Sequence, residues 1–230
     1  MNLPVVIAYV VAILLEIALP IVAGFWVESH LDVAWRLFAY GGLVFGVAQL
    51  AVRIPLMNVI GKNFHFTTQS GFVPLFAWSC LLAASAAIFE EGGRYLGYRF
   101  LFKDMRRNWN NAVMYGLGHG GRESIFLVGL PSLIGLANIL MVPGMDPEAM
   151  GLDAQQAQQL LVAKEQIAAL RFWMPLTGGL ERVLTLFFQV AMSVLVVQIF
   201  LRLAWHWLGY AIGLHFLVDL IVPTLATYVN

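Results

Sequence analysis

The sequence has 230 residues, of which 60% are hydrophobic and only 11% are charged, and its mean hydropathy is +0.80. Soluble domains usually carry about 25% charged residues, so this composition excludes an ordinary water-soluble protein. Lysine plus arginine and aspartate plus glutamate both number 13. No basic tract stands out, and nucleic acid is therefore excluded as a partner.

Six apolar stretches are long enough to cross a bilayer, which takes about 20 residues of helix. They cover residues 3–25, 36–57, 71–102, 111–141, 175–202 and 205–227. The first lacks a basic segment before it and exceeds a signal-peptide core, so we expect it to be retained. The pattern predicts an all-α, polytopic transmembrane helical bundle of six to seven spans, forming a single domain over residues 1–230. Its partner is then the lipid bilayer, and we expect a prokaryotic plasma membrane.

Two segments in the later part of the sequence predict a helix kink and a connecting helix. The stretch 111–141 is longer than a bilayer requires, and Pro131 is where such a helix could kink or break. The connection 142–171 opens with Pro143-Gly144 and Asp146-Pro147, which favour turns, and continues into a helical pattern over residues 153–170. That helix could lie in the membrane interface or simply be solvated.

The third span contains a group of charges that is costly inside a membrane. Glu90, Glu91 and Arg94 lie within five residues, although each charge at mid-bilayer costs about 2.5–3.5 kcal/mol on insertion scales. Glu90 and Arg94 are four residues apart and share a helix face. The spacing suits a general base with a balancing cation, or else a helix end that meets lipid headgroups.

Three later spans each carry another polar pair at a spacing of four residues: His119 with Glu123, Gln189 with Ser193, and His215 with Asp219. The first pair suits joint metal ligation or a hydrogen-bonded histidine and carboxylate. Four glycines between residues 116 and 121 would let a substrate or another helix approach closely. Glu181-Arg182 could simply anchor a helix end. Together the pairs predict one shared polar site inside the bundle.

These motifs resemble one known family over most of the chain. The segments FEEGGRY at 89–95, GLGHGGRE at 116–123, Glu181-Arg182 with Phe188-Gln189 and Ser193, and His215-xxx-Asp219 resemble the YhfC family of glutamic-type intramembrane proteases. Residues 49–56, QLAVRIPL, also look like the second span of that family. The pattern is more distantly similar to the PrsW and CAAX-processing membrane proteases. The resemblance implies that Glu90 or Glu91 activates a water, with the histidines helping to stabilise the oxyanion.

The sequence departs from those patterns at two positions. Gln189 stands where these families usually have a histidine, and Arg122 stands where an aliphatic residue is expected. An amide can donate to an oxyanion but cannot shuttle a proton and binds metals poorly. These departures leave open a less active or inactive relative. We would also expect such a family member to continue past Asn230 into another span.

The leading hypothesis is an intramembrane endopeptidase that cleaves membrane proteins or peptides. The candidate catalytic residues are Glu90, Glu91, Arg94, His119, Glu123, Gln189, His215 and Asp219. We expect no cofactor, because HExxH is absent and Cys80 is the only cysteine. A zinc-dependent protease using His119, Glu123, His215 and Asp219 is the alternative. A proton-coupled transporter and a catalytically silent membrane scaffold also remain open.

Overall fold

The computed structural model describes residues 2–64 and 71–229, and within these ranges all regular structure is helical. The long helices are α1 (Leu3–Ile13), α2 (Leu19–Leu31), α3 (Arg36–Phe45), α4 (Ile54–Phe64), α5 (Phe72–Phe100), α6 (Trp109–Glu123), α7 (Leu130–Met141), α8 (Ala154–Ala169), α9 (Trp173–Arg202) and α10 (His206–Val229). Three π-helical segments, η1 (Leu14–Ala18), η2 (Gly46–Arg53) and η4 (Ser124–Gly129), and the 3-10 turn η5 (Val142–Gly144) lie between them. The all-α prediction is confirmed.

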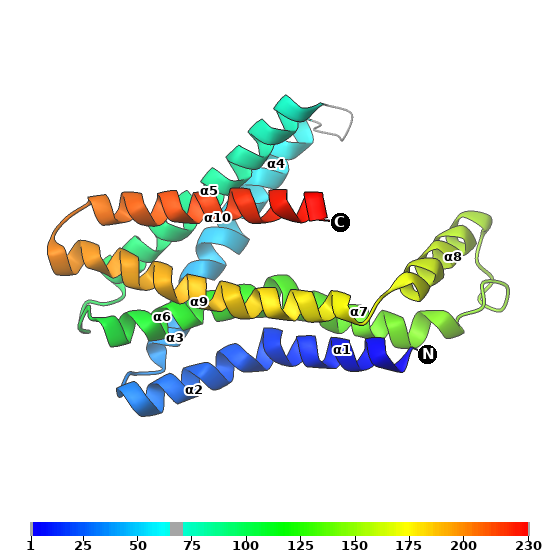
Figure 1. Ribbon diagram of the computed structural model, residues 1–230, viewed down its shortest axis with the longest axis horizontal. Helices are drawn as coiled ribbons and strands as arrows, with labels where there is room; N and C mark the ends of the chain where they lie inside the picture. Colours follow the sequence, from blue (N-terminus) through cyan, green and yellow to red (C-terminus); the bar gives the residue numbers. More distant parts are fainter. Residues whose placement is uncertain (1, 65–70, 230) are drawn as a thin grey trace. The chain divides into compact units, whose positions relative to one another are not determined.

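Within the described residues, five continuous helices are long and apolar enough to cross a membrane: Leu3–Leu31, Arg36–Asn63, Phe72–Phe100, Trp109–Gly144 and Trp173–Arg202. The sixth predicted stretch is also helical, and the apolar part described there, His206–Val222, is shorter than the others. The chain is therefore an integral membrane protein with a polytopic helical architecture. Figure 1 shows these helices in chain order.

The packing divides the chain into two compact units, which are described separately. One comprises Met1–Val22 with Glu123–Thr185, and the other comprises Ala23–Arg122 with Leu186–Asn230. We call them the first and the second unit. They are units of packing, and a single domain over residues 1–230 stays a prediction.

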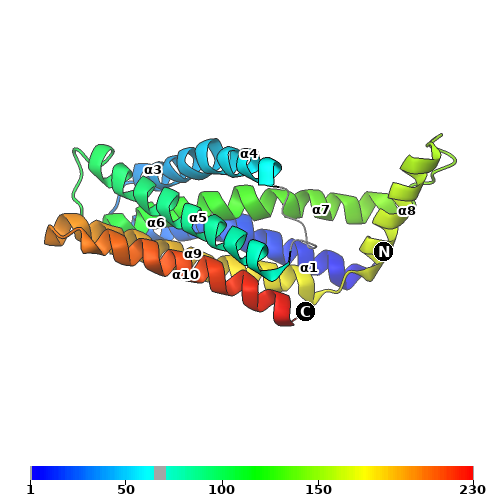
Figure 2. The same cartoon turned by 90° about the horizontal axis from the view of Figure 1, so that it is seen from above.

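In the first unit, α1 packs along α7 and η1 packs on η4, as Figure 2 also shows for α1 and α7. The hydroxyl of Ser124 donates to the backbone oxygen of Glu16 over 2.7 Å. The helix does not break at Pro131, because the wider π-helical turn of η4 directly precedes it. Proline has no N–H, and its ring crowds the carbonyl four residues earlier, at Leu127. A π-helical turn at that position accommodates both effects.

The connection after α7 folds as predicted. The turn η5 covers Val142–Gly144, and α8 begins after Asp153, whose side chain accepts from the Gln156 backbone N–H over 2.8 Å. The Gln156 side chain accepts from the Asp153 N–H in return, which makes a capping box. No residue of α8 is buried, so the choice between an interfacial and a solvated helix stays open.

In the second unit, α5 packs against α10, α3 and η2. The helices α3 and α6 cross with their backbones in contact, because both carry glycine at the crossing. A Cβ on Gly118 would lie 1.9 Å from the Phe38 carbonyl oxygen, and one on Gly41 would lie 2.0 Å from that of Tyr115. The glycine-rich run of α6 therefore serves close helix packing.

This crossing predicts that Gly118→Ala destabilises the protein, because the two backbones must separate to admit a methyl group. Overpacking of this kind costs about 1–3 kcal/mol. Thermal unfolding of the purified protein in detergent should show a clearly lower midpoint than for wild type. Gly92→Ala is the matched control, since a Cβ there would meet nothing within 4 Å. Equal midpoints for the two variants would contradict the crossing.

Candidate active site

Helix α5 carries three buried charged side chains at the centre of the second unit. Glu90 is 5% exposed, and Glu91 and Arg94 are fully buried. The guanidinium of Arg94 donates to Glu91 Oε1, and its Nη2 lies 3.6 Å from Glu90 Oε2. The expectation that Arg94 balances these carboxylates by contact is confirmed. A helix end that merely meets headgroups does not describe side chains this deeply buried.

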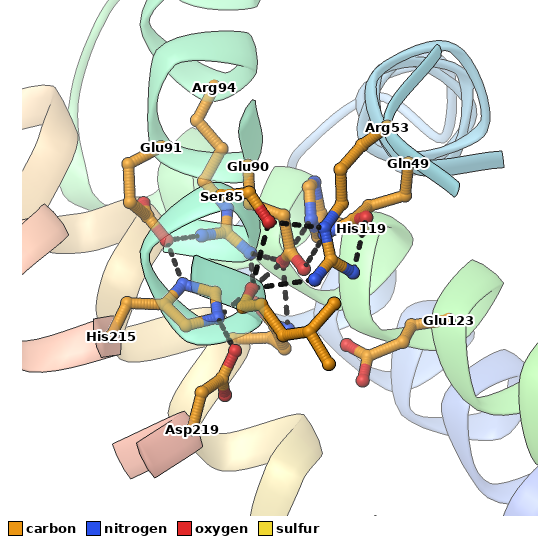
Figure 3. Close-up of polar contacts among 12 residues, drawn as sticks. Gln49, Arg53, Ser85, Glu90, Glu91, Arg94, His119, Glu123, His215 and Asp219 are labelled. Atoms are coloured by element: carbon orange, nitrogen blue, oxygen red, sulfur yellow. Dashed lines mark hydrogen bonds and ion pairs between the residues drawn. The ribbon is translucent and has the colours of Figure 1, made fainter. Parts of the chain in front are cut away.

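Glu90 is the common acceptor of donors from several helices (Figure 3). Its Oε2 accepts from His119 Nε2 of α6 over 3.0 Å and from Gln189 Nε2 of α9 over 3.2 Å. Its Oε1 accepts from Gln49 Nε2 of η2. A carboxylate offers about four acceptor positions, so three strong donors are enough to fix its orientation.

The second carboxylate of the pair holds a histidine. His215 Nδ1 donates to Glu91 Oε1 over 2.6 Å. This contact directs His215 Nε2 towards Glu90 Oε2 at 4.0 Å and towards Asp219 Oδ2 at 3.5 Å. The Asp219 side chain is 34% exposed, so the line of polar groups leads from the buried Glu90 outwards through His215 to Asp219.

The predicted convergence of polar side chains is therefore found within the second unit. Glu90, His119, Gln189 and His215 come from different helices and lie within hydrogen-bond or ion-pair distance of one carboxylate. Their neighbourhood is confirmed. Their roles in catalysis remain a prediction.

Arg94 also decides which way round the Gln189 amide points. Its Nη2 donates to Gln189 Oε1, so the amide oxygen is occupied and the amide nitrogen must face Glu90. Because a guanidinium has no acceptor atom, the opposite orientation would set donor against donor. Gln189 thus acts in this structure as a donor to Glu90.

Glu123 bonds elsewhere, in the first unit. Arg182 Nη1 donates to its Oε1 over 3.0 Å, and the same guanidinium pairs with the half-exposed Glu181. The two members of the predicted His119 and Glu123 pair therefore have different principal partners. Spacing of four residues shows which side chains share a helix face, but not which partners another helix brings to each of them.

Two polar residues at the site were missing from the candidate list. Gln49, 3% exposed, donates to Glu90, and Arg53 Nη1 donates to Gln49 Oε1 over 3.3 Å. Arg53 is itself fixed, because Nη2 donates to the Leu82 carbonyl over 2.6 Å and Nε to Ser85 Oγ over 3.1 Å. Gln49 and Arg53 are four residues apart in an apolar span. The rule that found the other pairs would have found this one.

This geometry predicts that Arg94→Ala is strongly destabilising, because it leaves Glu91 buried without its cation and removes the group that orients Gln189. Breaking a buried ion pair typically costs about 3–5 kcal/mol. The measurement is the thermal midpoint and the yield of folded protein in detergent. Arg99→Ala is the control, since Arg99 is exposed and its side chain donates to Tyr95 Oη, one turn earlier on α5. Unchanged stability of Arg94→Ala would contradict its role.

Comparison with known proteins identifies the family to which the chain belongs. Residues 15–229 match the model of a family described as YhfC intramembrane metalloprotease. The chain is 30% identical over 204 residues to the uncharacterized membrane protein YhfC of Bacillus subtilis (strain 168). The matched region covers 87% of this chain and 77% of the relative. No solved structure matches the chain. Because the match spans nearly all the helices that build the site, the chain belongs to the YhfC intramembrane metalloprotease family.

Proposed function

We propose that the protein is an intramembrane endopeptidase in which the Glu90 carboxylate activates a water molecule for attack on a peptide bond. One observation carries the proposal: a buried carboxylate accepts N–H donors from three other membrane-spanning helices and has a histidine of a further helix 4.0 Å away. Such polar groups inside a membrane are expensive and mark functional sites. The family description supports the same class of reaction.

Of the two adjacent carboxylates, Glu90 is better suited to be the base. Glu91 is fully buried, and its Oε1 is shared by Arg94 and His215. Its role is then to balance Arg94 and to orient the His215 ring. Glu90 lies at the inner end of the polar line through His215 to the partly exposed Asp219 and is itself 5% exposed, whereas Glu91 is fully buried.

The family description raises the question of whether these side chains fit a zinc ion. His215 does, because a carboxylate on Nδ1 is the usual outer partner of a ligating imidazole. Glu90 and His119 do not: amide groups donate to both oxygens of Glu90, and the buried Nδ1 of His119 has no hydrogen-bond partner to orient it. Among residues 2–64 and 71–229, no three His, Cys, Asp or Glu side chains gather as a metal site. The donor set in this arrangement therefore does not fit zinc.

The proposed reaction uses the groups of this chain alone. Glu90 takes a proton from water as the water oxygen bonds to the peptide carbonyl carbon. The negative charge that develops on the carbonyl oxygen is stabilised by the Gln189 amide, whose nitrogen carries a second N–H besides the one donated to Glu90, and by the charge of Arg94. When the tetrahedral intermediate collapses, the C–N bond breaks and Glu90 returns the proton to the leaving amine. The substrate is a membrane protein or peptide, because the site lies within membrane-spanning helices.

A zinc-dependent protease is the second candidate. The description of the family as metalloproteases favours it, and so does the way Glu91 orients His215. The ligands predicted for it from the sequence are His119, Glu123, His215 and Asp219, of which Glu123 is bonded to Arg182. The two candidates share a substrate class and differ in what activates the water.

The proposal predicts that Glu90→Gln abolishes proteolysis while the protein still folds, because an amide cannot accept the proton. Loss of a general base lowers the rate about 10²–10⁴-fold. New N-termini in the membrane fraction of cells expressing wild type should be absent with Glu90→Gln, by mass spectrometry. Gln198→Leu is the control, because Gln198 is also a glutamine in a span but bonds to Val194 and Arg202. Cells expressing this variant should still produce the new N-termini. The same set of new N-termini in cells expressing wild type and in cells expressing Glu90→Gln would count against proteolysis. An ion flux through the wild type that Glu90→Gln abolishes would also count against it.

The metal question has its own test. A protein that uses Glu90 as the base should be purified without stoichiometric zinc, and chelation should leave the cleavage of membrane proteins intact. Zinc catalysis predicts instead that Gln189→His raises both zinc content and cleavage, since an imidazole is a far better ligand than an amide. Elemental analysis of both proteins decides: about one zinc per wild-type chain would overturn the metal-free mechanism.

A further inference from the structure

The two oxygens of Glu90 have unequal surroundings. Oε2 accepts from His119 and from Gln189, and it also lies 3.6 Å from Arg94 Nη2. Among residues 2–64 and 71–229, the donor found on Oε1 is Gln49. Because a carboxylate oxygen offers about two lone-pair positions, the described donors fill those of Oε2 and leave one on Oε1. A water molecule that donates to Glu90 therefore meets Oε1.

The donor on Oε1 is held by a chain of hydrogen bonds that ends in the backbone. Arg53 donates to Gln49 Oε1 over 3.3 Å, so the Gln49 amide nitrogen must face Glu90. Arg53 is fixed in turn by the Leu82 carbonyl and by Ser85, one to two turns before Glu90 on α5. Arg94 orients Gln189 towards Oε2 in the same manner. Each oxygen of Glu90 thus has one amide donor, and an arginine sets the direction of each amide.

Gln49 reaches Glu90 from an irregular part of its helix. It lies inside the π-helical segment Gly46–Arg53, where it is the buried residue. Short π-helical segments are uncommon and are frequent at functional sites. A space-filling role does not require an amide here, and an amide in hydrocarbon is costly unless it is bonded.

We propose that Gln49 is a positioning residue for the base: its amide, oriented by Arg53, holds Glu90 so that Oε1 receives the proton from the attacking water. The proposal rests on the proposed role of Glu90. In the step concerned, a water O–H bond breaks, its proton passes to Oε1, and the oxygen forms a bond to the peptide carbonyl carbon. Gln49 keeps its own protons throughout and touches no substrate atom.

A substrate-independent measurement tests the contact. In the infrared spectrum of the full chain in lipid, the carboxylate band removed by Glu90→Gln identifies Glu90. Gln49→Leu and Gln49→Met should both move that band, because a donor to Oε1 is lost. Gln198→Leu is the matched control: Gln198 is also a span glutamine with an arginine, Arg202, four residues on, and it bonds to Val194 rather than to Glu90. A band that stays in place in both Gln49 variants overturns the proposal.

Kinetics on a membrane peptide cleaved by wild type test the consequence. Loss of a hydrogen bond to a charged group should lower kcat about 10- to 100-fold with KM unchanged. Gln49→Met keeps much of the side-chain volume but has no donor for Glu90, so it should lose as much kcat as Gln49→Leu, whereas a residue that only fills space would tolerate it. Adding Arg53→Met to Gln49→Leu should cost little more, because Arg53 acts through Gln49.

The outcomes separate the two proposals. If no peptide is cleaved by wild type, the proposed function fails, and the infrared shift still decides whether Gln49 holds Glu90. If cleavage requires Glu90 but Gln49→Leu keeps full kcat, or changes only KM, the positioning role is overturned while the function stands. If neither Gln49→Leu nor Gln49→Met folds, Gln49 is needed for stability, and the positioning role is overturned in that case too.

Discussion

The second unit depends on one buried guanidinium. Arg94 is fully enclosed within the membrane-spanning part of the chain, where an unpaired charge would be prohibitive. It bonds to Glu91 and Gln189 and lies 3.6 Å from Glu90. A guanidinium is planar and carries five donors, so a single residue can neutralise one carboxylate, attract a second and orient an amide. A lysine could supply the charge but not this geometry.

The constraint set by Arg94 extends to the rest of the site. Arg94 and His215 Nδ1 both donate to Glu91 Oε1, and this shared contact directs the opposite ring nitrogen of His215 towards Glu90. Because Arg94 occupies the oxygen of Gln189, the amide nitrogen faces Glu90. Glu90 is thereby crowded on Oε2 and left more open on Oε1. This asymmetry distinguishes the two oxygens of the proposed base.

Much of this architecture could be predicted from the sequence, because bilayer thickness and the cost of buried charge are strong constraints. They locate the later helices to within a few residues, although the first two continue beyond the predicted residues 25 and 57 to Leu31 and Asn63. They also identify Glu90, Arg94, His119 and His215 as inward-facing. The partner of each side chain was harder to predict. His119 bonds to Glu90 on another helix, and Glu123 bonds to Arg182, although their spacing suggested a pair. Spacing along one helix cannot rank partners that other helices bring, nor does it foresee a π-helical segment such as the one that carries Gln49.

The glycines of α6 explain how so many polar groups can share one acceptor. A Cβ on Gly120 would lie 2.8 Å from the Cβ of Gln189, so any larger residue would push α9 away and carry the amide out of reach of Glu90. N–H···O hydrogen bonds span about 2.7–3.2 Å, and the contact from Gln189 to Glu90 is already 3.2 Å long, so a displacement of one methyl radius would break it. The glycine run is costly for helix stability. The glycines nevertheless allow the site to assemble, because they let the helix backbones come close together. That close approach brings the polar side chains within hydrogen-bond distance of Glu90.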